Sequence, residues 1–138
     1  NVASMAGLLH MAGMSAYNTS KAAVVALSET LYSELDQYNV NVSVLCPAFF
    51  KTNLTDTMRS TNASGTVVAS KLMAKSNISA DDIARQVFEE SANGRFMILT
   101  HKTEKRVWMV KRFIPSLYFK MIKSTAKKFN AKMSGRQA

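Results

Sequence analysis

The sequence lacks several features that would narrow its function at once. Among 138 residues it has one cysteine, two histidines, two prolines and five glycines. A lone Cys46 excludes an intrachain disulfide framework and argues against a cysteine-based zinc site. His10 and His101 lie far apart and lack the spacing of metal ligands, so we expect no metal site. The small number of prolines and glycines is incompatible with a collagen-like or low-complexity chain.

Long hydrophobic runs are also absent. No apolar stretch approaches the ~18 residues that a membrane-spanning helix requires, and the first residues lack the pattern of a signal peptide. With 47% hydrophobic and 20% charged residues, the chain has the composition of one folded domain. It does not begin with Met, and we expect residue 1 to lie inside a longer sequence. A cytoplasmic location is expected, with membrane association as the alternative.

Acidic residues are scarce in the last part of the chain. Residues 101–138 hold 11 Lys/Arg and one acid, Glu104, whereas residues 1–100 hold 7 Lys/Arg and 8 Asp/Glu. The net charge of +9 therefore belongs to the C-terminal part. Such a tail suits a membrane surface or an acidic patch on a partner, and a solvated surface is the competing interpretation. No nucleic-acid-binding motif accompanies the charge, so we expect no nucleic-acid partner.

Apolar periodicity predicts alternating helices and strands. A helix is expected from Ser15 to about Tyr38, where apolar residues recur three and four positions apart. The residues of this stripe are Val24, Leu27, Leu31, Leu35 and Tyr38. Residues 40–46 are β-branched and alternating and end at Pro47, which predicts a strand. A long helix that returns into such a strand indicates an α/β fold.

The second half of the chain continues this pattern. A helix is expected from a capping box at Ser79 and Asp82 to Asn93–Gly94, followed by a strand over residues 96–100. From Thr103 onward we expect a helix that Pro115 kinks or breaks. Its apolar arc consists of Val107, Val110, Ile114, Leu117, Tyr118 and Met121, and its basic arc of Lys105, Arg112, Lys120, Lys123 and Lys127. This pattern is typical of a helix packed on its domain, or of one lying in a membrane interface with aromatic anchors.

The most informative pair of residues is Tyr17 and Lys21. They are four positions apart, so both project from the same face of the predicted helix. At ~5 Å and an effective dielectric of ~20, the ammonium favours the phenolate by about 3 kcal/mol. A phenol in that setting can donate and accept protons near neutral pH. Taken alone the pair is weak, because a surface tyrosine covered by a lysine stem gives the same spacing.

The surrounding residues make the pair specific. Ser4 lies 13 positions before Tyr17, in Asn-Val-Ala-Ser-Met-Ala-Gly, and Tyr17 opens Tyr-Asn-Thr-Ser-Lys-Ala. After the next strand comes Pro-Ala-Phe-Phe-Lys-Thr, at residues 47–52. This order resembles the short-chain dehydrogenase/reductase family, closely over residues 1 to about 55 and loosely over 79–100.

The resemblance implies a role for each matched residue. Tyr17 would be the general acid/base, Lys21 would bind the nicotinamide ribose and stabilise the phenolate, and Ser4 would stabilise the substrate oxygen. Pro47 and Thr52 would contact the nicotinamide of NAD or NADP, and residues 51–78 would form a mobile substrate lid with one or two short helices. The implied reaction interconverts a small alcohol and a carbonyl by hydride transfer.

Two features depart from the family pattern. The turn after the strand has Ala48 where the family has Gly. More importantly, no Gly-rich strand–turn–helix is present to cradle a pyrophosphate. We therefore expect residues 1–100 to be the catalytic, C-terminal half of a doubly wound, parallel-sheet Rossmann-like domain, and residues 101–138 to be a basic amphipathic helical tail. Activity of such a fragment alone is doubtful.

The resemblance also implies partners. The family commonly pairs subunits through the helix that carries Tyr and Lys, so we expect a homodimer or homotetramer. Methionines near the site, Met5, Met11 and Met14, are compatible with an apolar substrate, and equally with core filling. The alternative function is a non-catalytic interaction or membrane-surface module that acts through the basic C-terminus.

Overall fold

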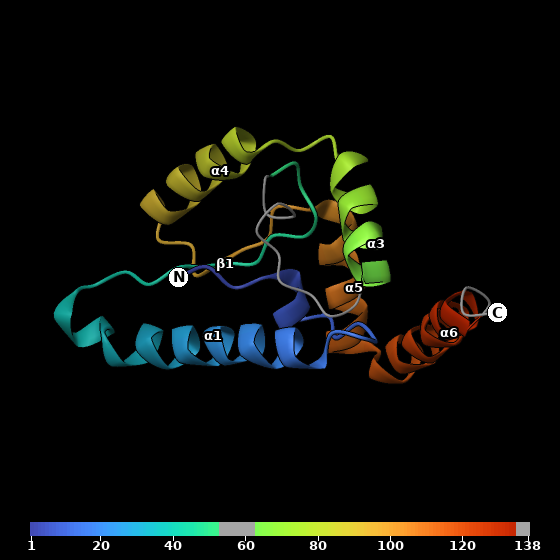
Figure 1. Cartoon of the computed structure of the whole chain (residues 1–138). Coiled ribbons are helices and arrows are strands. Elements are labelled where there is room, and N and C mark those ends of the chain that lie inside the picture. The colour runs from blue at the N-terminus through green and yellow to red at the C-terminus, as the bar shows by residue number, and fades with distance from the viewer. Residues whose placement is uncertain (53–62, 135–138) are drawn as a thin grey trace.

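A computed structural model describes residues 1–52 and 63–134 (Figure 1). The described strands and longer helices are α1 (Ser15–Glu34), β1 (Val44–Leu45), α3 (Ala63–Ala74), α4 (Ala80–Ala92), β2 (Met97–Ile98), α5 (Lys102–Phe113) and α6 (Pro115–Ser134). Two short 3₁₀ turns, η1 (Met5–Gly7) and η2 (Asp36–Tyr38), flank α1. The helices and strands expected from the sequence are confirmed, although α1 ends at Glu34 instead of Tyr38 and both strands are shorter than the predicted ranges.

The sheet is parallel. β1 pairs with β2, with Val44 opposite Met97 and Leu45 opposite Ile98. The first residues of the chain lie along the other edge of β1. The N–H of Leu45 donates to the carbonyl of Asn1, and the N–H of Ala3 donates to the carbonyl of Leu45, both at 2.9 Å. Parallel strands require crossover connections, and α1 and α4 lie in those connections.

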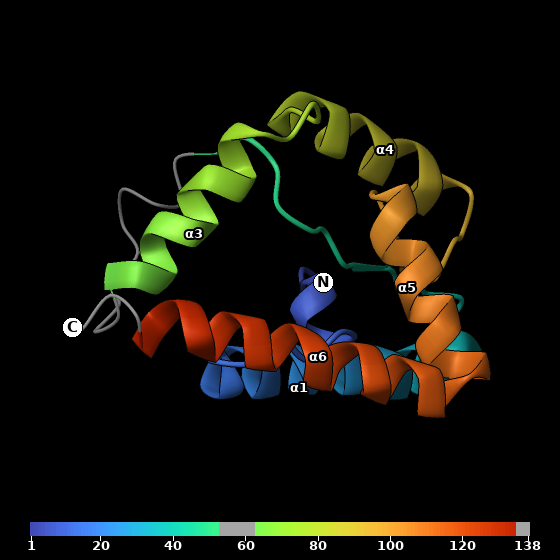
Figure 2. The ribbon, with the colours of Figure 1, turned by 90° about the vertical axis from the view of Figure 1, so that its right-hand side faces the viewer.

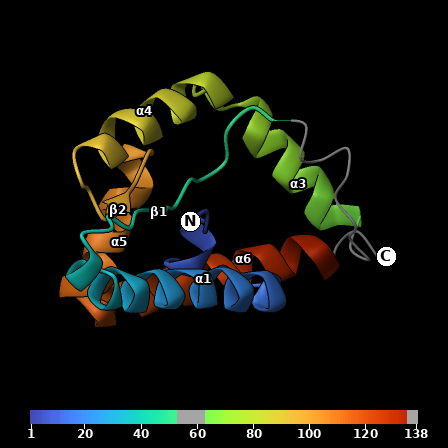
Figure 3. The ribbon, with the colours of Figure 1, turned by 90° about the vertical axis from the view of Figure 1, so that its left-hand side faces the viewer.

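The sheet is covered on both faces. Val44 and Cys46 pack with Val25 of α1 on one face, together with Trp108 of α5. Leu45 and Ile98 pack with Ile83 of α4 on the other face. This alternation follows the two-residue period of a strand. Figures 1 and 3 show α1 and α4 on opposite sides of β1. The predicted fold class, part of a doubly wound α/β domain, is confirmed.

The predicted apolar stripe of α1 is wrong in part. Leu27 is 54% exposed and Tyr38 is 67% exposed, whereas the buried residues of α1 are Asn18, Val25 and Ser28. The inner face of α1 is small and polar because other backbone segments approach it closely. Ser28 accepts a hydrogen bond from the Asn1 side chain at 3.0 Å, which ties the first residues to the helix.

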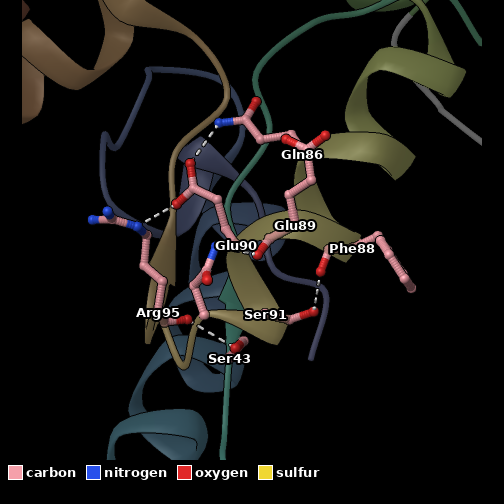
Figure 4. A network of polar contacts seen from close by, with 8 residues as sticks. Ser43, Gln86, Phe88, Glu89, Glu90, Ser91 and Arg95 are labelled. Carbon is pink, nitrogen blue, oxygen red and sulfur yellow. Dashed lines mark hydrogen bonds and ion pairs between the residues drawn. The ribbon is translucent and has the colours of Figure 1, made fainter.

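Helix α4 is fixed at both ends. Its start has the predicted capping box, in which Ser79 and Asp82 each accept from the other's backbone N–H. At its end, Glu90 pairs with Arg95 at 2.5 Å and accepts from Gln86 (Figure 4). The carbonyl of Arg95 accepts from Ser43, just before β1. These contacts fix β2 beside β1.

The C-terminal part forms two helices instead of one. Ile114, between α5 and α6, has φ −134° and ψ 64°, and Pro115 starts α6, so the predicted break is confirmed. The single apolar arc predicted across the break is wrong in part, since Val107 and Val110 are half-buried but other members are not. Ile114, Leu117 and Met121 are 50%, 44% and 44% exposed, whereas Tyr118 is 2% exposed. The break turns α6 relative to α5, so different residues face inward on the two helices (Figure 2).

Candidate active site

Tyr17 and Lys21 lie in the first two turns of α1. Tyr17 is 41% exposed, and the Nζ of Lys21 lies 5.8 Å from the centre of its ring. The same Nζ donates to the carbonyl of Val2 at 3.4 Å. Lys21 therefore reaches from the helix to the edge of the sheet, and its charge lies within cation–π distance of the phenol ring.

Ser4 lies where the edge segment of the sheet enters η1. Its Oγ accepts from the N–H of Ala6 at 3.2 Å and donates to the carbonyl of Pro47 at 3.4 Å. The hydroxyl thus caps η1 and also links this segment to the turn after β1. The structure therefore joins Ser4 to the Pro47 turn, and Lys21 to both Tyr17 and the strand just before Ser4.

The turn that contains Pro47 is held by a residue the sequence analysis did not assign to the site. His101 is 8% exposed, and its Nδ1 accepts from the N–H of Ala48 at 3.3 Å. Its Nε2 lies 3.1 Å from the carbonyl of Phe49. Because a carbonyl only accepts, Nε2 is the donor in this contact. No sequence signal near His101 indicates this role, since the two backbone groups that it holds, on Ala48 and Phe49, are more than fifty residues away.

Thr52 ends the described part of this turn. The neighbouring Lys51 donates its backbone N–H to the carbonyl of Ile78 at 3.2 Å, which brings the chain after α3 beside the turn. Of the predicted lid, residues 53–62 lie outside the described residues, and α3 provides one of its expected helices.

Asn18, next to Tyr17, is a second residue near the site that the sequence did not indicate. It is 7% exposed, and its Nδ2 donates to the carbonyl of Met11 at 2.9 Å. Its buried Oδ1 has no hydrogen-bond donor within the described residues. Asn18 therefore ties the start of α1 to the loop before it, and so fixes the base of the helix that carries Tyr17.

Gly7 allows η1 and α1 to pack closely against each other. A Cβ at this position would lie 2.6 Å from the carbonyl oxygen of Lys21, so η1 and α1 touch through their backbones. A glycine so covered cannot also cradle a phosphate. The donors present, Lys21 and the hydroxyls of Tyr17 and Thr52, suit the ribose and carboxamide of a nicotinamide cofactor. The described residues supply no pyrophosphate cradle and no cluster of three or more metal-ligating side chains.

Four other residues that the sequence analysis considered lie in the core or on the surface. Cys46 is fully buried, and burial raises the pKa of its thiol to about 11, so it is a core residue and not a nucleophile. Met5 is buried in the core, whereas Met11 is 43% exposed. The His10 side chain is exposed in the loop between Ser4 and Tyr17.

Comparison with known proteins gives the family. Residues 1–63 match the family model described as short chain dehydrogenase. The chain is 34% identical over 118 residues to the CLA biosynthesis dehydrogenase/reductase of Lactiplantibacillus plantarum, covering 73% of this chain and 41% of that protein. It is 27% identical over 128 residues to dehydrogenase/reductase SDR family member 7B of Mus musculus, covering 92% and 39%.

The fold has solved counterparts. A crystal structure of a short chain dehydrogenase/reductase from Burkholderia phymatum in complex with NAD superimposes with a TM-score of 0.73 at 33% identity, covering 85% of this chain and 47% of that one. The chain belongs to the short-chain dehydrogenase/reductase family. It spans about two fifths of the length of the curated relatives it matches.

Proposed function

We propose that the whole protein is an oxidoreductase that interconverts an alcohol and a carbonyl with NAD or NADP. The observation that carries the proposal is the exposed Tyr17–Lys21 pair, joined through Val2 to the strand that leads into Ser4. Family membership and relatives named as dehydrogenases support it.

Each residue of the site has a distinct part in the proposed reaction. The phenol of Tyr17 gives its proton to the substrate oxygen during reduction and takes it back during oxidation. The hydroxyl of Ser4 donates a hydrogen bond to the same oxygen, where negative charge develops. The Lys21 ammonium stabilises the phenolate that remains on Tyr17.

A bound NAD or NADP would supply the hydride chemistry. Lys21 would hold its ribose hydroxyls, and the turn from Pro47 to Thr52 would contact its nicotinamide. His101 holds that turn through the backbone of Ala48 and Phe49. Residues outside this chain are needed for the pyrophosphate, because the chain has no Gly-rich phosphate loop.

The test is turnover of the whole protein with Tyr17→Phe. The ring is retained and only the transferable proton is lost, so kcat falls about 1,000-fold or more while cofactor affinity is unchanged. Lys21→Ala lowers both, because it removes the ribose contact as well. Tyr32→Phe, which keeps the ring that packs on Phe96 and lies on the same helix, is the matched control. Near-normal turnover in Tyr17→Phe would refute the mechanism.

The whole protein is proposed to act as a homodimer or homotetramer through the outward face of α1. The residues on this face are exposed and mostly small, namely Ala23, Ala26, Leu27 and Thr30. Small side chains allow two helices to approach closely over a flat surface. A light-scattering mass of one subunit at micromolar concentration would contradict this assembly.

A second candidate function is contact with an anionic membrane surface through α5 and α6. Phe113 and Phe119 are 68% and 56% exposed, beside exposed basic side chains at Arg112, Lys120 and Lys123. No helix among the described residues is both long and apolar enough to span a membrane. Binding to anionic vesicles that salt weakens would support this function. Equal binding to neutral and anionic vesicles would exclude its electrostatic part.

A further inference from the structure

Side chains of α5 and α6 form hydrogen bonds with the backbone of the loop between Ser4 and Tyr17. The Nζ of Lys111, in α5, donates to the carbonyl of Leu8. The hydroxyl of Tyr118, in α6, accepts from the backbone N–H of His10 at 3.1 Å. Residues more than one hundred positions away in sequence therefore hold two backbone groups of this loop.

Lys111 and Tyr118 act as one unit. The Nζ of Lys111 lies 5.5 Å from the centre of the Tyr118 ring, which is within cation–π distance. Burial lowers the pKa of Lys111, and it raises the pKa of Tyr118. Placing a lysine and a phenol in such surroundings is unfavourable unless both are paired, and here both are paired with the loop.

A third contact lies further along the loop. Gly13 has φ +78°, and the ring of Phe129 lies 3.3 Å from the position a Cβ would take there. Gly13 precedes the first residue of α1 by two positions and Tyr17 by four. We call Lys111, Tyr118 and Phe129 the C-terminal clamp.

The ends of the loop are fixed separately. At one end, Ser4 is hydrogen-bonded to Pro47, and at the other, Asn18 is hydrogen-bonded to the carbonyl of Met11. The stretch between these ends is the part that the clamp contacts. Its conformation decides how the segment that carries Ser4 is joined to the helix that carries Tyr17.

We propose that Lys111 and Tyr118 are positioning residues for the reaction at Ser4 and Tyr17. By fixing the carbonyl of Leu8 and the N–H of His10, they hold Ser4 and Tyr17 in one relative placement. A small misplacement of reacting groups is costly in rate. This inference rests on the proposed function, and it gives the basic C-terminal helices a role inside the molecule.

The first test is hydrogen exchange of the loop amides in the whole protein, with no substrate or cofactor added. Tyr118→Phe keeps the buried ring and removes the acceptor of the His10 N–H. Exchange in residues 8–13 should become about five- to tenfold faster, the change expected for one ordinary hydrogen bond. Lys111→Met should give a similar change, and Lys120→Met, at an exposed position of α6, should give none. Unchanged exchange in Tyr118→Phe would overturn the clamp.

The second test separates positioning from mere structural support. In Tyr118→Phe, kcat should fall about tenfold while the KM for the cofactor stays within about twofold, because the loop affects the reacting groups and not the ribose contact. Faster exchange with unchanged kcat would overturn the positioning role. If the wild-type protein turns over no alcohol or carbonyl, the proposed function fails, and the exchange experiment still decides whether the clamp exists.

Discussion

Helices α1 and α6 are both 20 residues long, yet they are attached to the molecule in different ways. Helix α1 packs through its backbone and small side chains, with Gly7 against the carbonyl of Lys21 and with Asn18 and Ser28 buried. Helix α6 is attached through long side chains, chiefly the buried Tyr118.

The two kinds of contact differ in how closely they fix the position of a helix. A backbone contact leaves no room to adjust, because neither partner can change rotamer. A long side chain can change rotamer, so it fixes a position only where its polar end is also hydrogen-bonded, as the Tyr118 hydroxyl is to the His10 N–H. The helix that carries Tyr17 and Lys21 is thus the one held by a backbone contact, and the reaction proposed for these residues depends on precise placement.

The largest expected loss of stability comes from a substitution at the contact between η1 and α1. Gly7→Ala places a methyl group 2.6 Å from the Lys21 carbonyl oxygen, so two backbones must separate. We expect a loss of about 3 kcal/mol in unfolding free energy, the upper range for overpacking. Denaturant unfolding of the whole protein measures it.

Gly94→Ala is the matched control for that change. A Cβ at Gly94 meets no atom closer than 3.8 Å, but φ is +68°. Only backbone strain opposes it, so we expect a loss of about 1 kcal/mol. Equal losses of unfolding free energy in the two variants would show that the backbone contact of α1 adds nothing to the cost of the substitution.

The second largest loss of stability is expected where the start of α5 meets the turn after β1. His101 occupies the N-cap position of α5 without a side-chain capping hydrogen bond, and its imidazole holds the turn after β1. His101→Leu removes the partners of the Ala48 N–H and the Phe49 carbonyl, and we expect a loss of about 2 kcal/mol. His10→Leu, at an exposed loop side chain, should change the unfolding free energy by less than about 0.5 kcal/mol. Similar losses in the two variants would mean that the His101 side chain does not stabilise the turn after β1.

Local features of the fold could be predicted from the sequence, and long-range ones could not. The capping box at Ser79 and the break at Pro115 depend on neighbouring residues, so their patterns are visible in the chain. The exposure of Leu27 depends on which backbone approaches α1 from elsewhere. Likewise, nothing near Tyr118 shows that its hydroxyl meets an amide 108 residues away.

The same holds for the site. The spacing of Ser4, Tyr17 and Lys21 is a motif and could be recognised directly. His101 and Asn18 belong to no short motif, and their importance follows from buried hydrogen bonds to distant backbone. The residues proposed to contact substrate could thus be predicted from the sequence, whereas those that hold their segments in place required the structure.

A smaller effect is expected at α4, which is fixed by a capping box. The Ser79 hydroxyl and backbone N–H donate to Asp82 and lower the pKa of its carboxyl below 3.8. Because the folded-state pKa is depressed, the stabilisation is complete well above pH 3.8 and is lost as the pH falls through the lowered value. Asp82→Asn should therefore lower Tm at pH 7 and converge with wild type at acid pH.

Circular dichroism melts between pH 7 and pH 2.5 provide the measurement for Asp82. Asp81→Asn is the control, because Asp81 lies in the same first turn but outside the capping box. Its effect on Tm at pH 7 should be the smaller of the two. A Tm difference for Asp82→Asn that persists unchanged at the lowest pH would contradict the assignment.

The smallest effect is expected on the outer face of α6. Leu117 is 44% exposed, so Leu117→Gln removes little buried surface and should change the unfolding free energy by less than about 0.5 kcal/mol. Val25→Ala, on the inner face of α1, should cost about 2 kcal/mol, because Val25 is 6% exposed. A large loss in Leu117→Gln would mean that another part of the whole protein covers α6. An unchanged stability combined with weaker binding to anionic vesicles would instead assign the exposed face of α6 to a membrane surface.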